Sequence, residues 1–222
     1  MSKKITMQEH LVNFESQAAF FSWGQLNEQT QYVWVVLHGY KQLGKFFLKR
    51  FAHLDPQKHF VVAPQGLSKF YLGNDYQRVG ASWLTKEERQ VDLANQQNYL
   101  RAVFANLQTM PFFSEKKLVL LGFSQGVAAV SRWAVHQKIA FDKLILWAGI
   151  LPVELQNEDF SFLKPTSQTF TLIGTKDEFF SQDVFDTQTK RAKEFFGKTE
   201  GIIFEGGHEL LPEVLSKVVA NF

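Results

Sequence analysis

Six short runs of apolar residues recur along the chain from residue 32 onward, and each is followed by a polar or glycine-containing segment. The first run reads Tyr-Val-Trp-Val-Val-Leu, with no charged position. Such a run is typical of a strand buried on both faces of a parallel sheet, whereas a half-exposed strand would alternate. The runs predict strands over 32–37, 60–63, 118–121, 144–147, 170–173 and 201–204.

Four further segments carry apolar residues at the three- to four-residue spacing of a helix, as do Leu100, Val103, Phe104 and Leu107. They predict helices over 86–107, 127–134, 185–196 and 210–219. Because strands alternate with helices, we expect a mostly parallel central sheet with helices on both faces, an α/β fold. In the first thirty residues, loose alternation over 11–15 and 18–23 predicts a β-hairpin.

Composition is consistent with a single domain over 1–222. The hydrophobic fraction is 45% and the charged fraction 21%, both close to globular averages. A chain of 222 residues is long enough for one well-cored domain and too short for two ordinary ones. Lys and Arg total 24 against 22 Asp and Glu, and the resulting charge of +2 is too weak and scattered for a nucleic-acid-binding surface.

The chain contains no cysteine, which excludes disulfides, thiolate nucleophiles and cysteine-based zinc sites. The first ten residues lack the apolar stretch of a signal peptide, and no apolar run approaches the ~20 residues of a membrane span. We therefore expect a soluble, cytoplasmic protein without integral membrane association.

The strongest candidate for chemistry is the segment Gly-Phe-Ser-Gln-Gly at 122–126, directly after the predicted strand 118–121. Ligands in parallel sheets bind beyond the carboxyl ends of the strands. A sharp strand-to-helix turn would expose the hydroxyl of Ser124 there, and the flanking glycines would let strand and helix pack closely. The backbone N–H of Gln125 would face negative charge that forms beside the hydroxyl. The alternative is a structural turn serine.

A serine nucleophile needs a base and an acid, which follow it in the chain order Ser, acid, His in this architecture. Of the two histidines after Ser124, His136 lies more than two turns into the helix that begins at the nucleophile and cannot reach back. His208, in a glycine-rich loop after the last apolar run, is therefore the predicted base. Asp177, just after the run 170–173, is the predicted acid, and Glu178 is its nearest rival.

A second donor to the developing oxyanion is expected in the loop after the run 32–37, which reads His38-Gly39-Tyr40. Gly39 permits a close approach of the backbone, so we predict that the amide of Tyr40 acts together with that of Gln125. His38 precedes the serine in the chain and is predicted to brace the loop rather than to act as the base.

With these motifs, the chain resembles the phospholipase/carboxylesterase family of α/β-hydrolases, which includes the acyl-protein thioesterases. The matching pieces lie in family order and comprise 37–39, Ser82-Trp83, 122–126, 174–177 and 206–208. The resemblance implies an α/β-hydrolase fold and a serine esterase or thioesterase that uses no metal and no organic cofactor. It also supports Ser124, Asp177 and His208 as a catalytic triad. Members of the family usually continue past His-Gly with Gly and Asp, whereas this chain has Tyr40-Lys41-Gln42, so substrate choice is expected to differ.

The expected partner is a small-molecule ester or thioester with an apolar acyl group. Its binding residues are predicted among the apolar side chains of the long connections: Phe46, Phe70, Tyr71, Trp83 and Leu151. Ordinary loop packing is the alternative for each of them. Two other functions stay open: a non-catalytic binding module on the same fold, and an amidase or peptidase.

Overall fold

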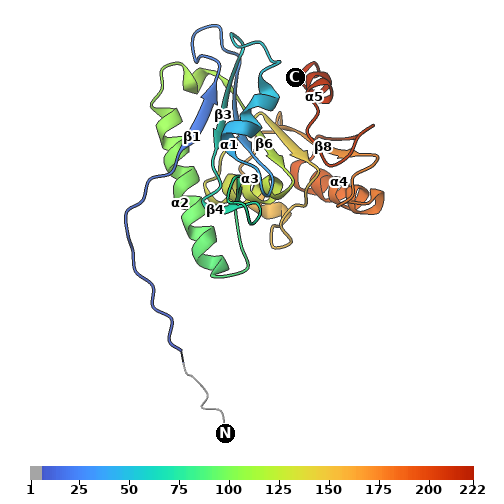
Figure 1. Ribbon diagram of the computed structural model, residues 1–222. Coiled ribbons are helices and arrows are strands. Elements are labelled where there is room, and N and C mark those ends of the chain that lie inside the picture. Colours follow the sequence, from blue (N-terminus) through green and yellow to red (C-terminus); the bar gives the residue numbers. More distant parts are fainter. Residues whose placement is uncertain (1–6) are drawn as a thin grey trace.

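A computed structural model describes residues 7–222 of the chain (Figure 1). Residues 1–6, which belong to the predicted domain and to the segment searched for a signal peptide, lie outside the described residues. The main sheet has seven strands in the order β1-β3-β2-β6-β7-β8-β9. Its strands are β1 (Phe20–Trp23), β2 (Tyr32–Leu37), β3 (His59–Pro64), β6 (Lys117–Phe123), β7 (Lys143–Trp147), β8 (Gln168–Gly174) and β9 (Thr199–Phe204). All neighbours pair in parallel except β1 with β3, which confirms the six predicted strands and the mostly parallel sheet.

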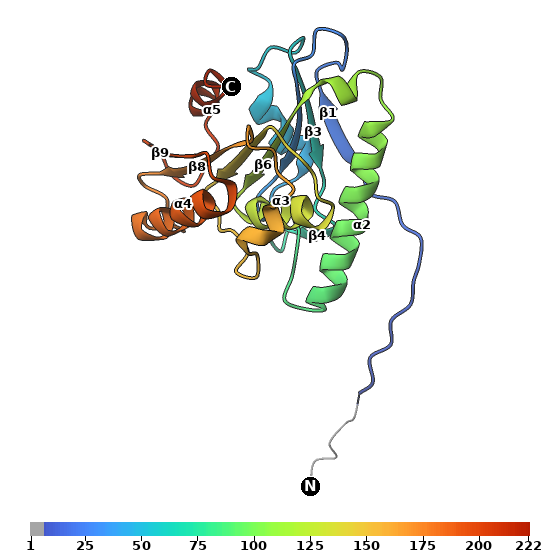
Figure 2. The same cartoon turned by 180° about the vertical axis from the view of Figure 1, so that it is seen from behind.

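Helices cover both faces of this sheet, as predicted. One face carries α2 (Arg89–Gln108), α3 (Gln125–His136) and α4 (Gln182–Phe196), which lie across the near side in Figure 2. The other face carries α1 (Gly44–Phe47), the 3₁₀ turn η1 (Leu48–Phe51) and α5 (Pro212–Val219). Strand β2 shows why its sequence run is continuous: Val33 and Val35 point into the first core, and Trp34 and Val36 into the second.

The predicted N-terminal hairpin is wrong. Residues 7–19 have no regular secondary structure and run away from the sheet (Figure 1), and Leu11 and Phe14 are 67% and 79% exposed. Strand β1 pairs with the free edge of β3 instead, so that Phe21 lies opposite Ala63. An isolated two-stranded hairpin is marginal in water, whereas the edge of a buried sheet provides both hydrogen bonds and a core.

The sequence pattern also missed several short elements. The main addition is a separate hairpin of β4 (Ser68–Tyr71) and β5 (Val79–Ser82), which lies within the connection from β3 to α2. The others are α1, η1 and the 3₁₀ turns η2 (Phe113–Glu115) and η3 (Asn157–Phe160). Among residues 7–222, no helix combines the length and the apolar character needed to cross a membrane.

Candidate active site

Ser124 occupies a strained turn between β6 and α3. Its φ of 54° and ψ of −118° lie outside the regions that residues with a side chain ordinarily adopt. The Ser124 N–H donates to the carbonyl of Trp147 at 2.8 Å. The turn depends on its glycines: a Cβ on Gly122 would lie 2.5 Å from the carbonyl oxygen of Gly126, and one on Gly126 would collide with that of Leu37. The sequence therefore forms this turn because strand, turn and helix are in backbone contact.

The structure brings Ser124, His208 and Asp177 together, although each comes from a different connection. The distance from His208 Nε2 to Ser124 Oγ is 2.9 Å, and that from His208 Nδ1 to Asp177 Oδ2 is 2.8 Å. An ionised carboxylate can only accept, so Nδ1 carries the proton and Nε2 is left to accept from the serine hydroxyl. This arrangement can remove a proton from Ser124 as the hydroxyl attacks an electrophile.

The acid and the base are each fixed by neighbouring groups. The side chain of Asp177 is fully buried, and its Oδ1 accepts from the backbone N–H groups of Phe179 and Phe180 at 2.9 and 3.1 Å. The imidazole of His208 lies among aromatic rings, with centroid distances of 4.7 Å to Phe179 and 5.1 Å to Phe123. These rings limit the access of water to the imidazole and restrict its rotation. The sequence signal for this aromatic surround is the pair Phe179-Phe180 shortly after Asp177, which the sequence analysis did not use.

The two rejected alternatives lie apart from this chain of hydrogen bonds. His136 is the exposed last residue of α3. Glu178 is exposed and, within the described residues, makes no hydrogen bond to His208.

The backbone amides of Tyr40 and Gln125 lie near Ser124 and have no acceptor in the described part of the chain. A Cβ on Gly39 would lie 3.2 Å from the Cβ of Ser124, so the loop after β2 approaches the serine directly. The Gly39 N–H itself donates to Oε1 of Gln42 at 2.9 Å, which leaves the next amide, that of Tyr40, free. Two free amides beside a hydroxyl can stabilise an oxyanion.

His38 is fully buried beneath this loop and holds it in place. The Gly66 N–H donates to its Nε2 at 3.0 Å, so Nδ1 carries the proton and donates to the Gly39 carbonyl at 2.8 Å. Burial lowers the pKa of His38 from 6.5 to about 4, because the charged ring would lose its hydration. The neutral ring therefore links the loop to the segment after β3, as the sequence predicted.

The side chain of Gln125 makes contacts that the sequence did not reveal. Its Oε1 accepts from the Trp83 N–H at 3.0 Å, and its Nε2 donates to Oγ of Ser82 at 2.8 Å. Trp83 in turn donates from Nε1 to the carbonyl of His38 at 2.7 Å. These bonds tie the strand-to-helix turn to the loop after β2, which fixes the two free amides relative to each other.

Three hollows adjoin these residues. The first, here the Trp83 groove, has a volume of about 540 Å³ and is lined by both oxyanion candidates together with Trp83, Ala128 and Ala129. The second, the Lys45 groove, has a volume of about 580 Å³ and lies between α1 and the β4–β5 hairpin.

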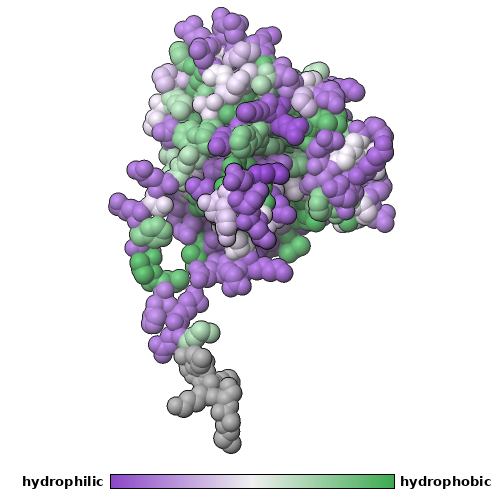
Figure 3. Space-filling model, in the orientation of Figure 1, coloured by the Kyte–Doolittle hydropathy of each residue, from purple (hydrophilic) through white to green (hydrophobic). Residues whose placement is uncertain are grey.

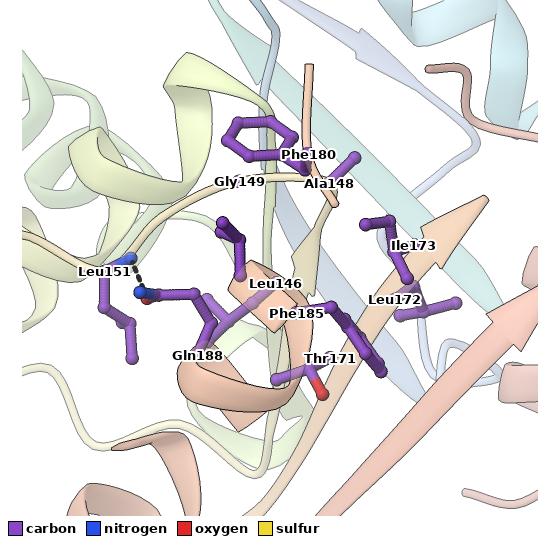
Figure 4. Close-up of a pocket in the computed structure, with 11 residues that line it drawn as sticks. Leu146, Ala148, Gly149, Leu151, Thr171, Leu172, Ile173, Phe180, Phe185 and Gln188 are labelled. Atoms are coloured by element: carbon purple, nitrogen blue, oxygen red, sulfur yellow. Dashed lines mark hydrogen bonds between the residues drawn. The ribbon is translucent and has the colours of Figure 1, made fainter. Parts of the chain in front are cut away.

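The third hollow, the Leu151 crevice, is narrow and has a volume of about 20 Å³. It lies between β7, β8 and α4 (Figure 4), where the N–H of Leu151 donates to Oε1 of Gln188 at 2.9 Å. It lies close to His208, because Phe180, whose ring lies 5.7 Å from that of His208, forms part of its wall.

The five residues predicted to bind substrate do not share one wall. Trp83, Phe46 and Leu151 each line a different hollow. Phe70 packs against the ring of Tyr40 with centroids 5.4 Å apart, and Tyr71 is 56% exposed. The unforeseen β4–β5 hairpin is the reason. It places Phe70 against Tyr40 in the loop after β2 (residues 38–42, here the oxyanion loop), and it turns Tyr71 to the exposed side, where its ring contacts that of Tyr76.

No group of three or more His, Cys, Asp or Glu side chains in residues 7–222 is arranged to hold a metal ion.

Comparison with known proteins gives structural likeness without close sequence relatives. No model of a protein family matches the sequence, and no curated protein matches it. Among solved structures, acyl-protein thioesterase 2 of Zea mays is 17% identical with a TM-score of 0.69, covering 92% of this chain and 97% of its own. Esterase PE8 is 18% identical with a TM-score of 0.69, covering 93% and 98%. A phospholipase/carboxylesterase from Dyadobacter fermentans is 16% identical with a TM-score of 0.64, covering 91% and 94%. The likeness over nearly the whole chain shows that the protein has the α/β-hydrolase fold.

Proposed function

We propose that the protein is a serine hydrolase that cleaves carboxylic esters or thioesters with an apolar acyl group. The observation that carries the proposal is the unbroken chain of hydrogen bonds from Ser124 through His208 to the buried Asp177, at 2.9 and 2.8 Å. A structural turn serine needs neither an oriented imidazole nor a strained backbone, so the alternative of a turn serine leaves both features without a cause.

The reaction proceeds in two steps of acyl transfer. The Ser124 hydroxyl attacks the carbonyl carbon while Nε2 of His208 takes its proton, and the amides of Tyr40 and Gln125 stabilise the oxyanion. The C–O or C–S bond then breaks as His208 protonates the leaving alcohol or thiol, which leaves an acyl-serine. Water, deprotonated by the same imidazole, attacks the acyl carbon; the bond from that carbon to Ser124 Oγ breaks as His208 returns the proton to Oγ, and the carboxylic acid departs. Each oxyanion donor is worth about 3 kcal/mol of transition-state stabilisation.

The lining of the Trp83 groove supports the proposal that the acyl group is apolar. It begins at the two oxyanion candidates and continues along the indole of Trp83 and the small side chains of Ala128 and Ala129 on α3. An ester whose carbonyl oxygen faces the amides of Tyr40 and Gln125 would extend its chain along this apolar surface.

The test uses two measurements on the purified protein. A fluorophosphonate probe should label wild-type protein, and the label should be absent from Ser124→Ala. Hydrolysis of a 4-nitrophenyl acyl ester should fall by on the order of 10⁴-fold or more in Ser124→Ala, because the nucleophile is lost while binding remains. Asp177→Asn should also lose most activity, since His208 is no longer held in the active tautomer.

Ser161→Ala is the matched control, because Ser161 is exposed and far along the chain from the site. It should keep both labelling and activity. Full activity in Ser124→Ala would refute the mechanism. A folded wild-type protein that takes no label and cleaves no ester would favour a binding module, and cleavage of paired amides in preference to esters would favour an amidase.

A further inference from the structure

The Lys45 groove has a pronounced charge imbalance. Its floor is apolar, formed by Leu43, Phe47 and Leu72, and four cationic side chains line it. They are the exposed Lys41, Lys45, Arg50 and Arg78. No acidic side chain is among the lining residues.

The imbalance extends to the segments that form the groove. Residues 38–54 contain four lysines or arginines and no Asp or Glu, and residues 66–80 contain Lys69 and Arg78 against Asp75 alone. None of these six cations forms a salt bridge within the described residues. The formal charge of the whole chain is only +2. A strong positive potential is therefore concentrated beside the oxyanion loop, although the molecule as a whole is nearly neutral.

Aromatic rings support three of these cationic groups at the surface. The ammonium group of Lys45 lies 4.9 Å and that of Lys49 5.4 Å from the ring centroid of Phe46, and that of Lys41 lies 5.4 Å from the centroid of Tyr40. Cation–π contacts keep the charges beside the groove without neutralising them. Figure 3, in the orientation of Figure 1, shows hydrophilic and hydrophobic side chains intermixed on the face that carries α1.

The Trp83 groove lacks such an excess, although Lys86, Arg89 and Arg132 line it. Arg132 pairs with Glu154 at 2.6 Å, and residues 84–92 contain Glu87, Glu88 and Asp92 against Lys86 and Arg89. An anionic ligand is therefore attracted to the Lys45 groove rather than to the Trp83 groove.

The Lys45 groove adjoins the loop of the candidate active site that carries Tyr40. Gln42, in its wall, accepts from Gly39 at 2.9 Å, and the Lys41 N–H donates to the carbonyl of Ala81 at 2.9 Å, so the groove and the oxyanion loop share one framework. Phe47, in the floor, stacks on Phe123 with centroids 6.1 Å apart, and Phe123 contacts His208. The groove therefore lies directly beside the oxyanion loop, next to the position that an ester at Ser124 would occupy.

We propose that the Lys45 groove binds an anionic group, a phosphate or a carboxylate, on the part of the ester that does not react. The inference rests on the proposed hydrolase function and specifies its substrate class: esters with one apolar arm and one anionic arm. Arg50 and Arg78 offer planar donors to two oxygens at once, and the lysines add mobile point charges.

The test compares soluble esters in matched pairs. Mono-4-nitrophenyl glutarate against 4-nitrophenyl valerate places a carboxylate on the acyl side, and 1-butyrylglycerol 3-phosphate against 1-butyrylglycerol places a phosphate on the alcohol side. In at least one pair, wild-type protein should show a kcat/KM about tenfold higher for the anionic ester, mainly through a lower KM. Raising the salt concentration tenfold should remove most of this preference.

The preference should be lost in Lys45→Gln/Arg78→Gln, whose side chains are exposed and support no core. The matched control, Lys164→Gln/Lys190→Gln, removes two exposed charges near β8 and on α4 and should keep it. Equal kcat/KM values within both pairs for wild-type protein, or a preference that survives in Lys45→Gln/Arg78→Gln, would overturn the inference while leaving the hydrolase function intact. Failure to hydrolyse any of the four esters would overturn both.

Discussion

At the scale of single residues, Ser124 combines the proposed role of nucleophile with an unfavourable backbone conformation. Its φ of 54° and ψ of −118° are a cost that the packing of Gly122 and Gly126 imposes, because strand β6 and helix α3 leave the serine no other conformation. The hydroxyl lies where the imidazole of His208 and the two candidate oxyanion donors meet. The strained conformation thus lowers the stability of this turn while it fixes the position of the Ser124 side chain.

This cost predicts an unusual effect of glycine on stability. Ser124→Gly should have a free energy of unfolding about 1 kcal/mol higher than Ser124→Ala, because relief of backbone strain outweighs the extra freedom of glycine in the unfolded chain. Urea denaturation of the two variants measures the difference. At Ser161, whose φ of −59° is ordinary, Gly should instead be less stable than Ala. The same sign at both positions would contradict the interpretation.

At the scale of elements, the loop after β2 depends on a histidine that must stay neutral. Between about pH 4 and 6.5 the unfolded chain binds more protons at His38 than the folded one does, so acidification lowers the free energy of unfolding. Nothing charged contributes to this shift, which arises from burial and is only partly opposed by the hydrogen bond to Gly39. The oxyanion loop should therefore be sensitive to mild acid.

The free energy of unfolding should fall by about 2 kcal/mol from pH 7 to pH 5 through His38, whose pKa in the folded protein is about 4. Over this pH range the free energy of unfolding of wild-type protein should fall by this amount more than that of His38→Gln, whose side chain at position 38 does not titrate. Denaturation curves at several pH values give the difference directly. Parallel pH dependence of the two proteins would show that another group is responsible.

The contact between α3 and β2 gives a second prediction at this scale. Gly126→Ala should lower the free energy of unfolding by about 3 kcal/mol or more, because the added methyl group collides with the carbonyl oxygen of Leu37, which cannot yield without moving the strand. Gly207→Ala is the control, since its Cβ would find no atom closer than 3.7 Å. Thermal unfolding of the two variants compares them, and a similar loss in both would argue against close packing of α3 on β2.

At the scale of the whole molecule, the pattern of apolar runs predicts the sheet well because its parallel strands are buried on both faces. The elements that the pattern missed or paired wrongly lie where burial is one-sided or decided by a neighbour. Strand β1 lies within the predicted strand 18–23, but it pairs with the free edge of β3 rather than with 11–15. The missed β4–β5 hairpin has the mixed burial of a strand pair near the surface. The site shows the same division. Chain order was enough to select Ser124, Asp177 and His208 as candidates, whereas the side-chain contacts of Gln125 join segments 41 to 43 residues apart and need the folded chain.

The residues proposed to cleave an ester follow the ends of sheet strands, whereas the Lys45 groove is formed by α1 and the tip of a separate hairpin. The exposed positions of the groove can therefore vary without disturbing the strand ends, although Phe47, which packs on Phe123, cannot. A mutant library confined to the exposed residues 45, 46, 49, 50 and 73–79 could be screened for acceptance of new esters while the proposed hydrolytic residues stay unchanged.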